Sequence, residues 1–345
     1  MNEKEVTFLS TRGRGLGIDQ ALLKSYLSEY RAQQLSFRFY LNNEMIKNPV
    51  AAYGYRRAKR EFCQGMTNAI CLDASLTSNM RNSLGGGKRI LLSVPYDYQF
   101  KNMLHCDKGR KFHLNSMSAF EYVLLGSPFS ERLFEQAYRK HEYQKRLRVT
   151  LPFVWDLLQE ESRKEVAEKI FYYFPEARGK KILSVIVYGD DDKKRKDWER
   201  FPVKEFLKGI QEDFFVFTNS DILMENSFAL SSKYRQHFGY ISRILPVQDV
   251  LYITDVLVTN NGRFAASFAC RKKPIWVCAY NSNAFERYMQ HNYPALFLDK
   301  AEHLLRDFTG QNLMEQQKKF CQDMLYDELL SPYEAVDSIL ELPES

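Results

Sequence analysis

Four consecutive residues in the second half of the chain, Asn260, Asn261, Gly262 and Arg263, have side chains that suit the binding of an anion. The apolar residues before them predict a buried strand, the Asn-Asn-Gly triplet is typical of a turn, and the residues after it are expected to form a helix. Ligands of open α/β sheets lie at the carboxyl ends of strands, where backbone N–H groups and the positive end of a helix attract phosphate. We therefore predict that these four residues bind a nucleotide diphosphate, with an ordinary strand–turn–helix unit as the alternative.

Three other polar segments contain residue types that are suited to catalysis or binding. A segment containing Tyr96, Asp97 and Lys101 follows an apolar run, a position in which sheets present active-site loops. Residues 53–62 place four cations between aromatic rings, which suits lipid headgroups or an acidic chain, with the solvated face of a helix as the alternative. Residues 190–192 are three aspartates, but four basic residues follow at once, so we expect a solvated loop and no metal site.

Composition and charge narrow the class of protein. The chain has 345 residues, 45% of them hydrophobic and 27% charged, which is typical of a soluble globular protein with about two domains. Residues 1–150 carry 24 Lys and Arg against 13 Asp and Glu, whereas the remainder carries 25 against 30, so we expect an anionic partner on the front half. The six cysteines form no CxxC pair, and the first residues lack a signal-peptide pattern, so we expect a cytoplasmic protein.

Strands and helices alternate along the whole chain. The rhythm predicts an α/β fold with two Rossmann-like domains facing a cleft, residues 1–155 and 156–345, with C-terminal helices assigned to the second domain. Residues 156–174 are expected to form one long helix between the two halves. A glycine-rich turn, 13–17, follows the first predicted strand, and Asp19 is expected to cap the helix after it.

The segment 251–280 resembles the donor-site motif of CDP-glycerol glycerophosphotransferases, the teichoic-acid and capsule polymerases. The family pattern is an aspartate, three apolar residues, Thr-Asp-Tyr-Ser-Ser, an apolar run, and Lys-Pro before another apolar strand. In this chain the pattern begins at Asp255, and Lys273 and Pro274 supply its end. Weaker similarity extends over most of the chain. The resemblance implies a two-domain fold of the GT-B type and a nucleotide-linked donor.

Several positions differ from the family pattern. The family's His-Gly dipeptide is Tyr96-Asp97 here, and Lys101 stands at the place of the family lysine. A His-Pro dipeptide in the back half is replaced by Asn219 and Ser220, which the resemblance places at the donor site. The donor-site serines are replaced by a glycine and an arginine, and a guanidinium is a stronger phosphate partner than a hydroxyl.

The resemblance therefore implies catalysis by Asp97 as general base, with Tyr96 and Lys101 beside it; His105 and His113 are alternative bases. We expect a glycosyl- or polyol-phosphate transferase that uses a CDP- or UDP-linked donor in cell-surface polymer synthesis, with no cofactor beyond that donor. The acceptor would be an anionic polymer or a lipid-linked chain, and the protein would associate peripherally with the inner face of the cell membrane.

Two other functions are open. Loss of both family histidines favours a catalytically inactive relative that binds a polymer, a membrane or a partner enzyme. A nucleic-acid binder is supported only by charge and aromatic residues, without any recognisable nucleic-acid-binding motif, so we do not expect that partner.

Overall fold

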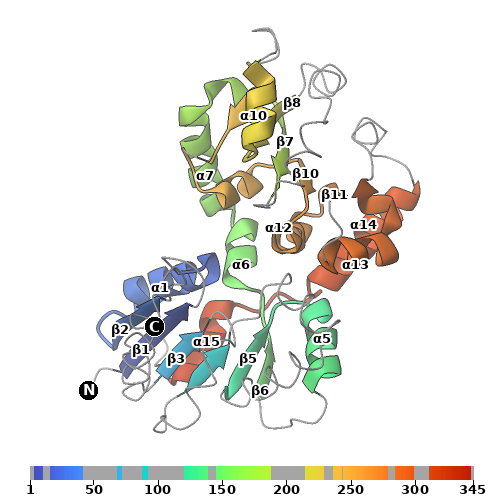
Figure 1. Cartoon of the computed structure of the whole chain (residues 1–345). Helices are drawn as coiled ribbons and strands as arrows, with labels where there is room; N and C mark the ends of the chain where they lie inside the picture. Colours follow the sequence, from blue (N-terminus) through green and yellow to red (C-terminus); the bar gives the residue numbers. More distant parts are fainter. Residues whose placement is uncertain are drawn as a thin grey trace, which may run out of the picture. The chain divides into compact units, whose positions relative to one another are not determined.

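The chain folds into two compact units. The computed structural model describes residues 4–10, 16–41, 68–71, 88–91, 120–138, 145–187, 214–228, 236–242, 244–278, 284–298 and 311–342. One unit comprises Met1–Trp155 together with Leu325–Ser345, and the other comprises Asp156–Met324 (Figure 1). Each unit is built on its own sheet, as the alternation of strands and helices predicts.

The sheet of the first unit has six strands in the order β2-β1-β3-β4-β5-β6, and every neighbouring pair is parallel. Its strands are β1 (Lys4–Ser10), β2 (Leu35–Leu41), β3 (Asn68–Cys71), β4 (Arg89–Leu91), β5 (Tyr122–Leu125) and β6 (Lys145–Arg148). Two crossover helices are described, α1 (Ile18–Tyr30) between β1 and β2 and α5 (Pro128–Tyr138) between β5 and β6. Strand order reverses between β1 and β3, which makes that pair the topological switch point of this sheet.

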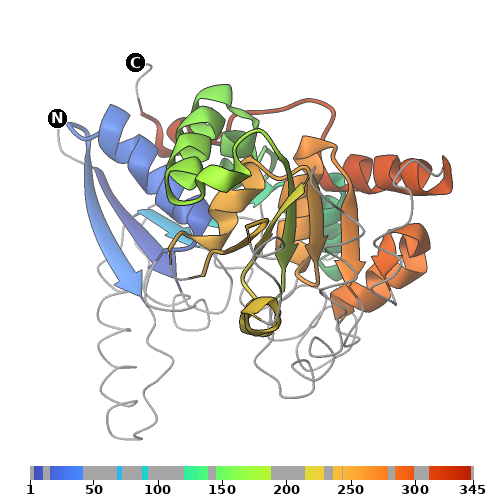
Figure 2. The same ribbon diagram turned by 90° about the horizontal axis from the view of Figure 1, so that it is seen from above.

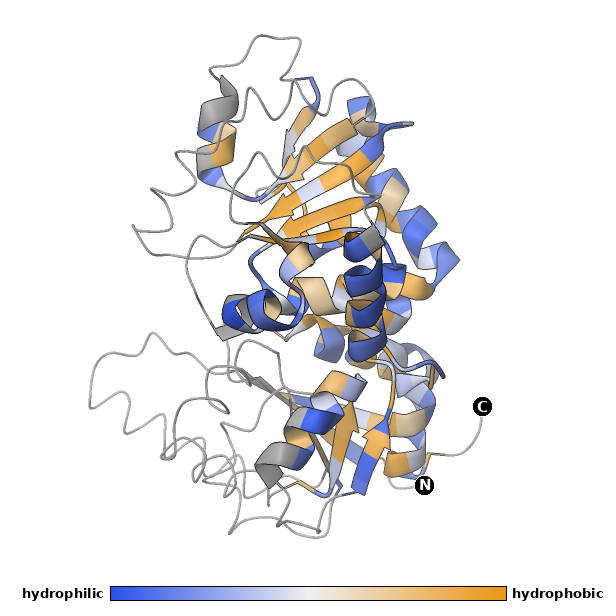
Figure 3. Cartoon of the chain, turned by 90° about the vertical axis from the view of Figure 1, so that its right-hand side faces the viewer, coloured by the Kyte–Doolittle hydropathy of each residue, from blue (hydrophilic) through white to orange (hydrophobic). Residues whose placement is uncertain are grey.

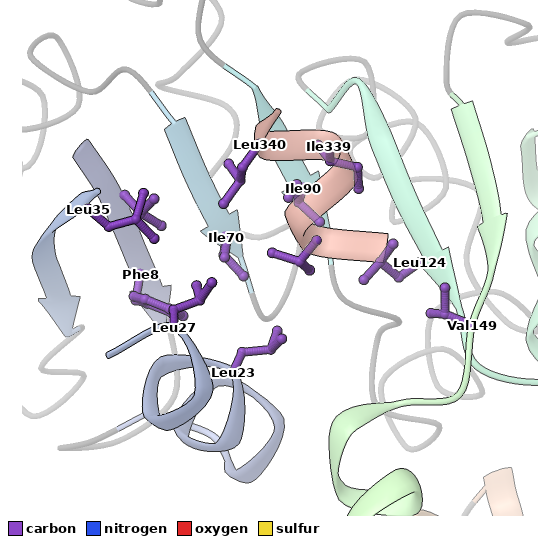
Figure 4. Close-up of a cluster of buried hydrophobic side chains, with 12 residues drawn as sticks. Phe8, Leu23, Leu27, Leu35, Ile70, Ile90, Leu124, Val149, Ile339 and Leu340 are labelled. Carbon is purple, nitrogen blue, oxygen red and sulfur yellow. The ribbon is translucent and has the colours of Figure 1, made fainter. Parts of the chain in front are cut away.

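One apolar cluster covers a face of this sheet (Figure 4). It joins strand residues to side chains of α1 and of the last helix, α15 (Pro332–Leu340). Parallel register sets the strand side chains in a row, because Phe8 pairs with Ile70 and Ile70 pairs with Ile90. The cluster comprises Val6, Phe8, Leu23, Leu27, Leu35, Ile70, Ile90, Leu124, Val149, Val336, Ile339 and Leu340.

The last helix belongs to the first unit, which corrects the assignment of all C-terminal helices to the second domain. Asp337 of α15 is buried and accepts hydrogen bonds from Arg31 Nη2 at 2.5 Å and from Tyr26 Oη at 2.8 Å, both through its Oδ2 atom. The Lys4 ammonium donates to the carbonyl oxygens of Leu340 (2.7 Å) and Glu341 (2.9 Å) at the end of the helix. An amphipathic pattern shows that a helix needs a partner but does not say which sheet supplies it.

The hydroxyl of Tyr26 gives a pH-dependent test of this contact. Burial, followed by the hydrogen bond to Asp337, raises the pKa of Tyr26 from 10.0 to about 12. Because the folded-state pKa is raised, the stability from the protonated hydroxyl is complete below about pH 10 and is lost as the pH rises towards about 12. We expect the difference in unfolding free energy between the wild type and Tyr26→Phe to shrink across that interval in denaturant titrations. A difference that does not change with pH would contradict the role assigned to the hydroxyl.

The start of α1 also differs from the sequence prediction. Helix α1 begins at Ile18 with Gly17 as its N-cap, and no side chain caps it. Asp19 is buried, and its Oδ1 atom accepts the backbone N–H of Phe153 at 2.9 Å, so this carboxylate caps helix α6 (Pro152–Leu158) instead. Residues 11–15 of the glycine-rich turn lie outside the described part of the chain.

The second unit has a six-stranded parallel sheet in the order β12-β11-β10-β7-β8-β9. Its strands are β7 (Lys181–Ile186), β8 (Phe214–Thr218), β9 (Phe238–Tyr240), β10 (Val256–Thr259), β11 (Ile275–Cys278) and β12 (Phe297–Leu298). All four residues of β10 are buried, as are the last five of β7 and the last four of β8. Unbroken apolar strands are typical of a parallel sheet covered on both faces. In Figure 2 the strands lie side by side, and in Figure 3 strands are mostly orange while helices mix blue with orange.

The helices after residue 155 are separate elements, and α6 crosses the boundary between the two units in the sequence. The expected single helix over 156–174 is two helices, α6 and α7 (Glu160–Tyr173), with Gln159 as the extended N-cap of the second. The others are α10 (Asp221–Phe228), α12 (Gly262–Phe268), α13 (Ala284–Asn292) and α14 (Gln311–Met324), with 3-10 turns η2 (Pro175–Ala177), η3 (Val247–Tyr252), η4 (Ala269–Arg271) and η5 (Pro294–Leu296). In the part of the chain that is described, no helix combines the length and apolar character that crossing a bilayer requires.

Candidate functional site

The topological switch point of the second sheet lies between β7 and β10. The chain proceeds from β7 through β8 to β9 on one side, and β10, β11 and β12 follow on the other side. This is the doubly wound order that places ligands outside the carboxyl ends of the strands at the switch. Residues 260–263 follow β10 directly and therefore lie at that edge. The position predicted for the anion site is thus the position that the topology favours.

The connection from β10 to α12 is held together by its own side chains. Thr259 is fully buried, and its hydroxyl accepts the backbone N–H of Asn261 at 3.0 Å. The Oδ1 atom of Asn261 then accepts the N–H groups of Arg263 at 2.9 Å and Phe264 at 3.3 Å. Asn261 therefore caps α12, and the amides of Asn261, Arg263 and Phe264 already have acceptors.

The geometry limits what this turn can offer to a phosphate. The Asn261 amide, a backbone group of the predicted anion site, is directed to Thr259. The amide of Gly262, the first residue of α12, is not engaged by the Asn261 cap. The Arg263 side chain is partly exposed, whereas Asn260 is 9% exposed. Gly262 is itself buried, so the Arg263 guanidinium is the group of the turn whose chemistry best suits an anion.

The end of β8 repeats this arrangement. Thr218 is fully buried, and its hydroxyl donates to Val185 O at 2.9 Å and accepts the Ser220 N–H at 3.1 Å. The Ser220 hydroxyl accepts the N–H of Leu223 at 3.3 Å in the first turn of α10. A threonine as the last strand residue, an asparagine, and a capping residue therefore recur as 218–220 and 259–261.

Neither threonine was recognised from the sequence as part of the site. The signal that could have found them is the repeat of Thr-Asn directly after an apolar run. Serine, threonine and asparagine side chains satisfy the N–H groups of turns and helix starts, and that is how both loops use them. Asn219 and Ser220, predicted to contact the donor, thus use their side chains on the protein backbone.

The aspartate and lysine of the donor motif, Asp255 and Lys273, lie at the amino ends of the strands, opposite residues 260–263. Lys273 Nζ donates to Asp255 Oδ1 at 2.6 Å and to Thr254 O at 3.2 Å, and Asp255 Oδ2 accepts the Ile182 N–H at 2.8 Å. These contacts tie together the amino ends of β7, β10 and β11. The aspartate and lysine that define the motif therefore hold the strands in register, while residues 260–263 lie at the carboxyl ends of the strands.

The site predicted in the first unit lies outside the described residues. Tyr96, Asp97 and Lys101 belong to the interval 92–119, and so do His105 and His113. The basic aromatic segment and the three aspartates of 190–192 are also outside the described part. Among the residues that the structure describes, no three His, Cys, Asp or Glu side chains are grouped so as to hold a metal ion.

A known protein family matches most of the chain. Residues 1–297 match the family model described as CDP-Glycerol:Poly(glycerophosphate) glycerophosphotransferase. No curated protein sequence matches the chain.

Solved structures with a similar fold include several of the wall teichoic acid polymerase TagF. A variant with alanine in place of a histidine has a TM-score of 0.69 and 15% identity, covering 98% of this chain and 88% of that chain. A histidine-to-asparagine variant soaked with CDPG has a TM-score of 0.64 and 16% identity, covering 98% and 87%. The N-terminal domain of Candida albicans trehalose-6-phosphate phosphatase has a TM-score of 0.50 and 10% identity, covering 99% and 97%. The predicted α/β fold with two Rossmann-like domains, of the GT-B type, is confirmed.

Proposed function

The chain belongs to the CDP-glycerol:poly(glycerophosphate) glycerophosphotransferase family, and on that premise we propose that it transfers a polyol-phosphate group from a CDP-linked donor to a cell-surface polymer. The observation that carries the proposal is the position of the Asn260–Arg263 turn, which follows β10 at the switch point of a doubly wound sheet. Transfer of a glycosyl group from a UDP-linked donor is the other reaction that such a site can serve.

The proposed reaction is displacement at phosphorus. The acceptor hydroxyl oxygen attacks the phosphorus that carries the polyol, and the bond from that phosphorus to the bridging oxygen of the diphosphate breaks. Cytidine monophosphate leaves with the bridging oxygen, and the proton of the acceptor hydroxyl passes to a base. Such a reaction needs a positioned base and fixed positive charge at the departing phosphate.

We assign the fixed charge to the β10–α12 turn. The Arg263 guanidinium is the charged group of the turn, with the Gly262 N–H at the start of α12, and Arg is well suited to bidentate phosphate binding. In the first unit, Asp97 is proposed as the base with Tyr96 beside it, and Lys101 as a further cation for the phosphates. These three roles rest on the place of the residues in the family pattern.

The acceptor and the cellular location are proposed from charge. The excess of Lys and Arg over residues 1–150 suits an anionic polymer or a lipid-linked chain as acceptor. The same excess would favour peripheral association with the inner, anionic face of the cell membrane.

Nucleotide binding tests the proposed function. We expect CDP and a CDP-linked polyol to raise the thermal unfolding midpoint of the wild type, because a ligand at a hundred times its dissociation constant stabilises a fold by roughly 2.7 kcal/mol. Arg263→Ala should raise the Kd for CDP at least about tenfold, since a hydrogen bond to a charged group contributes roughly 1.5–3 kcal/mol. Isothermal titration calorimetry gives the Kd directly.

The matched control is Arg178→Ala, which removes an exposed arginine of the same unit that is bound to Glu168 at 2.7 Å. Its Kd for CDP should equal that of the wild type. Failure of the wild type to bind CDP-, UDP- or GDP-linked nucleotides would end the proposal. Equal weakening in both variants would mean that Arg263 acts through general charge and is not a ligand.

A second function is favoured by the replacement of both family histidines. Tyr96-Asp97 and Asn219-Ser220 stand where the family pattern has His-Gly and His-Pro. A relative without a working base would still bind the nucleotide, and would act by binding a polymer, a membrane or a partner enzyme. The two functions differ in one observable, the release of cytidine monophosphate by the purified protein in the presence of acceptor.

A further inference from the structure

The side-chain amide of Asn219 makes two hydrogen bonds to the same residue. Its Oδ1 atom accepts the backbone N–H of Val187 at 2.9 Å, and its Nδ2 atom donates to the carbonyl oxygen of Val187 at 2.9 Å. Val187 is the first residue after β7, which is the strand next to the switch point. The amide therefore continues the pairing of β7 and β8 beyond the last strand pair, Val185 with Thr218.

The backbone of Asn219 connects the same point to a third strand. Its carbonyl oxygen accepts a hydrogen bond from the Ser242 hydroxyl at 3.1 Å, two residues after the end of β9. Tyr240, the last residue of β9, donates its hydroxyl to Asp221 Oδ1 at the start of α10. The carboxyl ends of β7, β8 and β9 are thus joined through residue 219 and its neighbours.

The chemistry of Val187 fixes which residue type can make this contact. A backbone N–H only donates and a carbonyl oxygen only accepts, so the contact needs one acceptor and one donor on the same short side chain. Asparagine provides both. A carboxylate has no proton to donate, and alanine has neither group. The orientation of the amide is determined by these two partners.

We propose that Asn219 is a positioning residue of the donor site, which acts by holding the chain at Val187 against β8 and does not itself bind the nucleotide. The inference rests on the proposed function. Val187 follows the carboxyl end of β7, between the ends of β8 and β10, where a doubly wound sheet binds its ligands. Binding groups must be held within about 0.5 Å of the productive geometry, so we expect a displacement at Val187 to weaken nucleotide binding.

The test is the affinity for CDP of Asn219→Asp near neutral pH. The ionised carboxyl cannot donate to Val187 O, and we expect the Kd for CDP to rise roughly tenfold, with kcat at saturating donor within about twofold of the wild type.

Two further variants separate positioning from general stability. Asn292→Asp makes the same change at an asparagine whose Nδ2 donates to Tyr288 O at 2.9 Å, at the end of α13. It should leave the Kd for CDP unchanged. Asn219→Ala removes both bonds, so its Kd should be raised at least as far as that of Asn219→Asp.

The outcomes are distinct. A Kd for Asn219→Asp equal to that of Asn292→Asp would overturn the inference, and so would a wild-type Kd for Asn219→Ala. Failure of the wild type itself to bind CDP would instead overturn the proposed function, and this inference with it.

Discussion

Asp337→Asn is expected to lower the free energy of unfolding of the first unit by about 3 kcal/mol, a loss that denaturant titration can measure. Asp337 and Arg31 are both buried, and the carboxylate accepts from Arg31 Nε at 3.1 Å and Nη2 at 2.5 Å. The carboxylate in turn raises the pKa of the Arg31 guanidinium through these hydrogen bonds. Replacing the carboxylate by an amide leaves a buried positive charge without a counterion, and burial of an unpaired charge is strongly unfavourable.

Two other variants show whether the effect comes from the buried charge. Glu168→Gln removes the carboxylate of an exposed ion pair with Arg178, and the unfolding midpoint should hardly change. The double variant Arg31→Met, Asp337→Leu removes both buried charges and should recover much of the lost stability, because apolar replacements of a buried pair are often neutral or stabilising. If Asp337→Asn destabilises the protein no more than Glu168→Gln, the last helix does not depend on this pair.

Asp97→Asn is expected to reduce the release of cytidine monophosphate from a CDP-linked polyol by roughly a hundredfold or more, the usual contribution of a general base. The amide cannot accept the proton of the acceptor hydroxyl, while its size is nearly that of the carboxyl group. The Kd for CDP should remain that of the wild type, so the loss should fall on kcat. The measurement is single-turnover release of the nucleotide with acceptor present.

The control is Asp191→Asn, which makes the same change in the charged segment 190–192, where we expect no catalytic role. It should release nucleotide at the wild-type rate. If Asp97→Asn is fully active and His105→Gln or His113→Gln is not, the base has been assigned to the wrong residue. Wild-type protein that binds CDP but releases no nucleotide would favour the inactive relative.

Much of the second unit is determined by the sequence itself. The apolar run that ends at Thr259, the turn residues after it and the helix that starts at Gly262 are local signals, and each forms the element it predicts. The Thr-Asn pair at the end of β8 and again at the end of β10 is also local, because each threonine hydroxyl accepts the amide of a residue only two positions later. The family match over residues 1–297 confirms the resemblance noted in the motif.

Other features were decided only by tertiary structure. Asp19 was expected to cap its own helix but caps α6, 134 residues further along the chain. The same holds for α15, whose Asp337 pairs with a residue 306 positions earlier, and for Asn219, whose partner Val187 lies 32 positions away. In each case a polar side chain has several possible backbone or charged partners of equal chemistry. The sequence determines which side chains can form such a bond. The partner depends on tertiary structure, because the apolar core determines which strands and helices pack against each other.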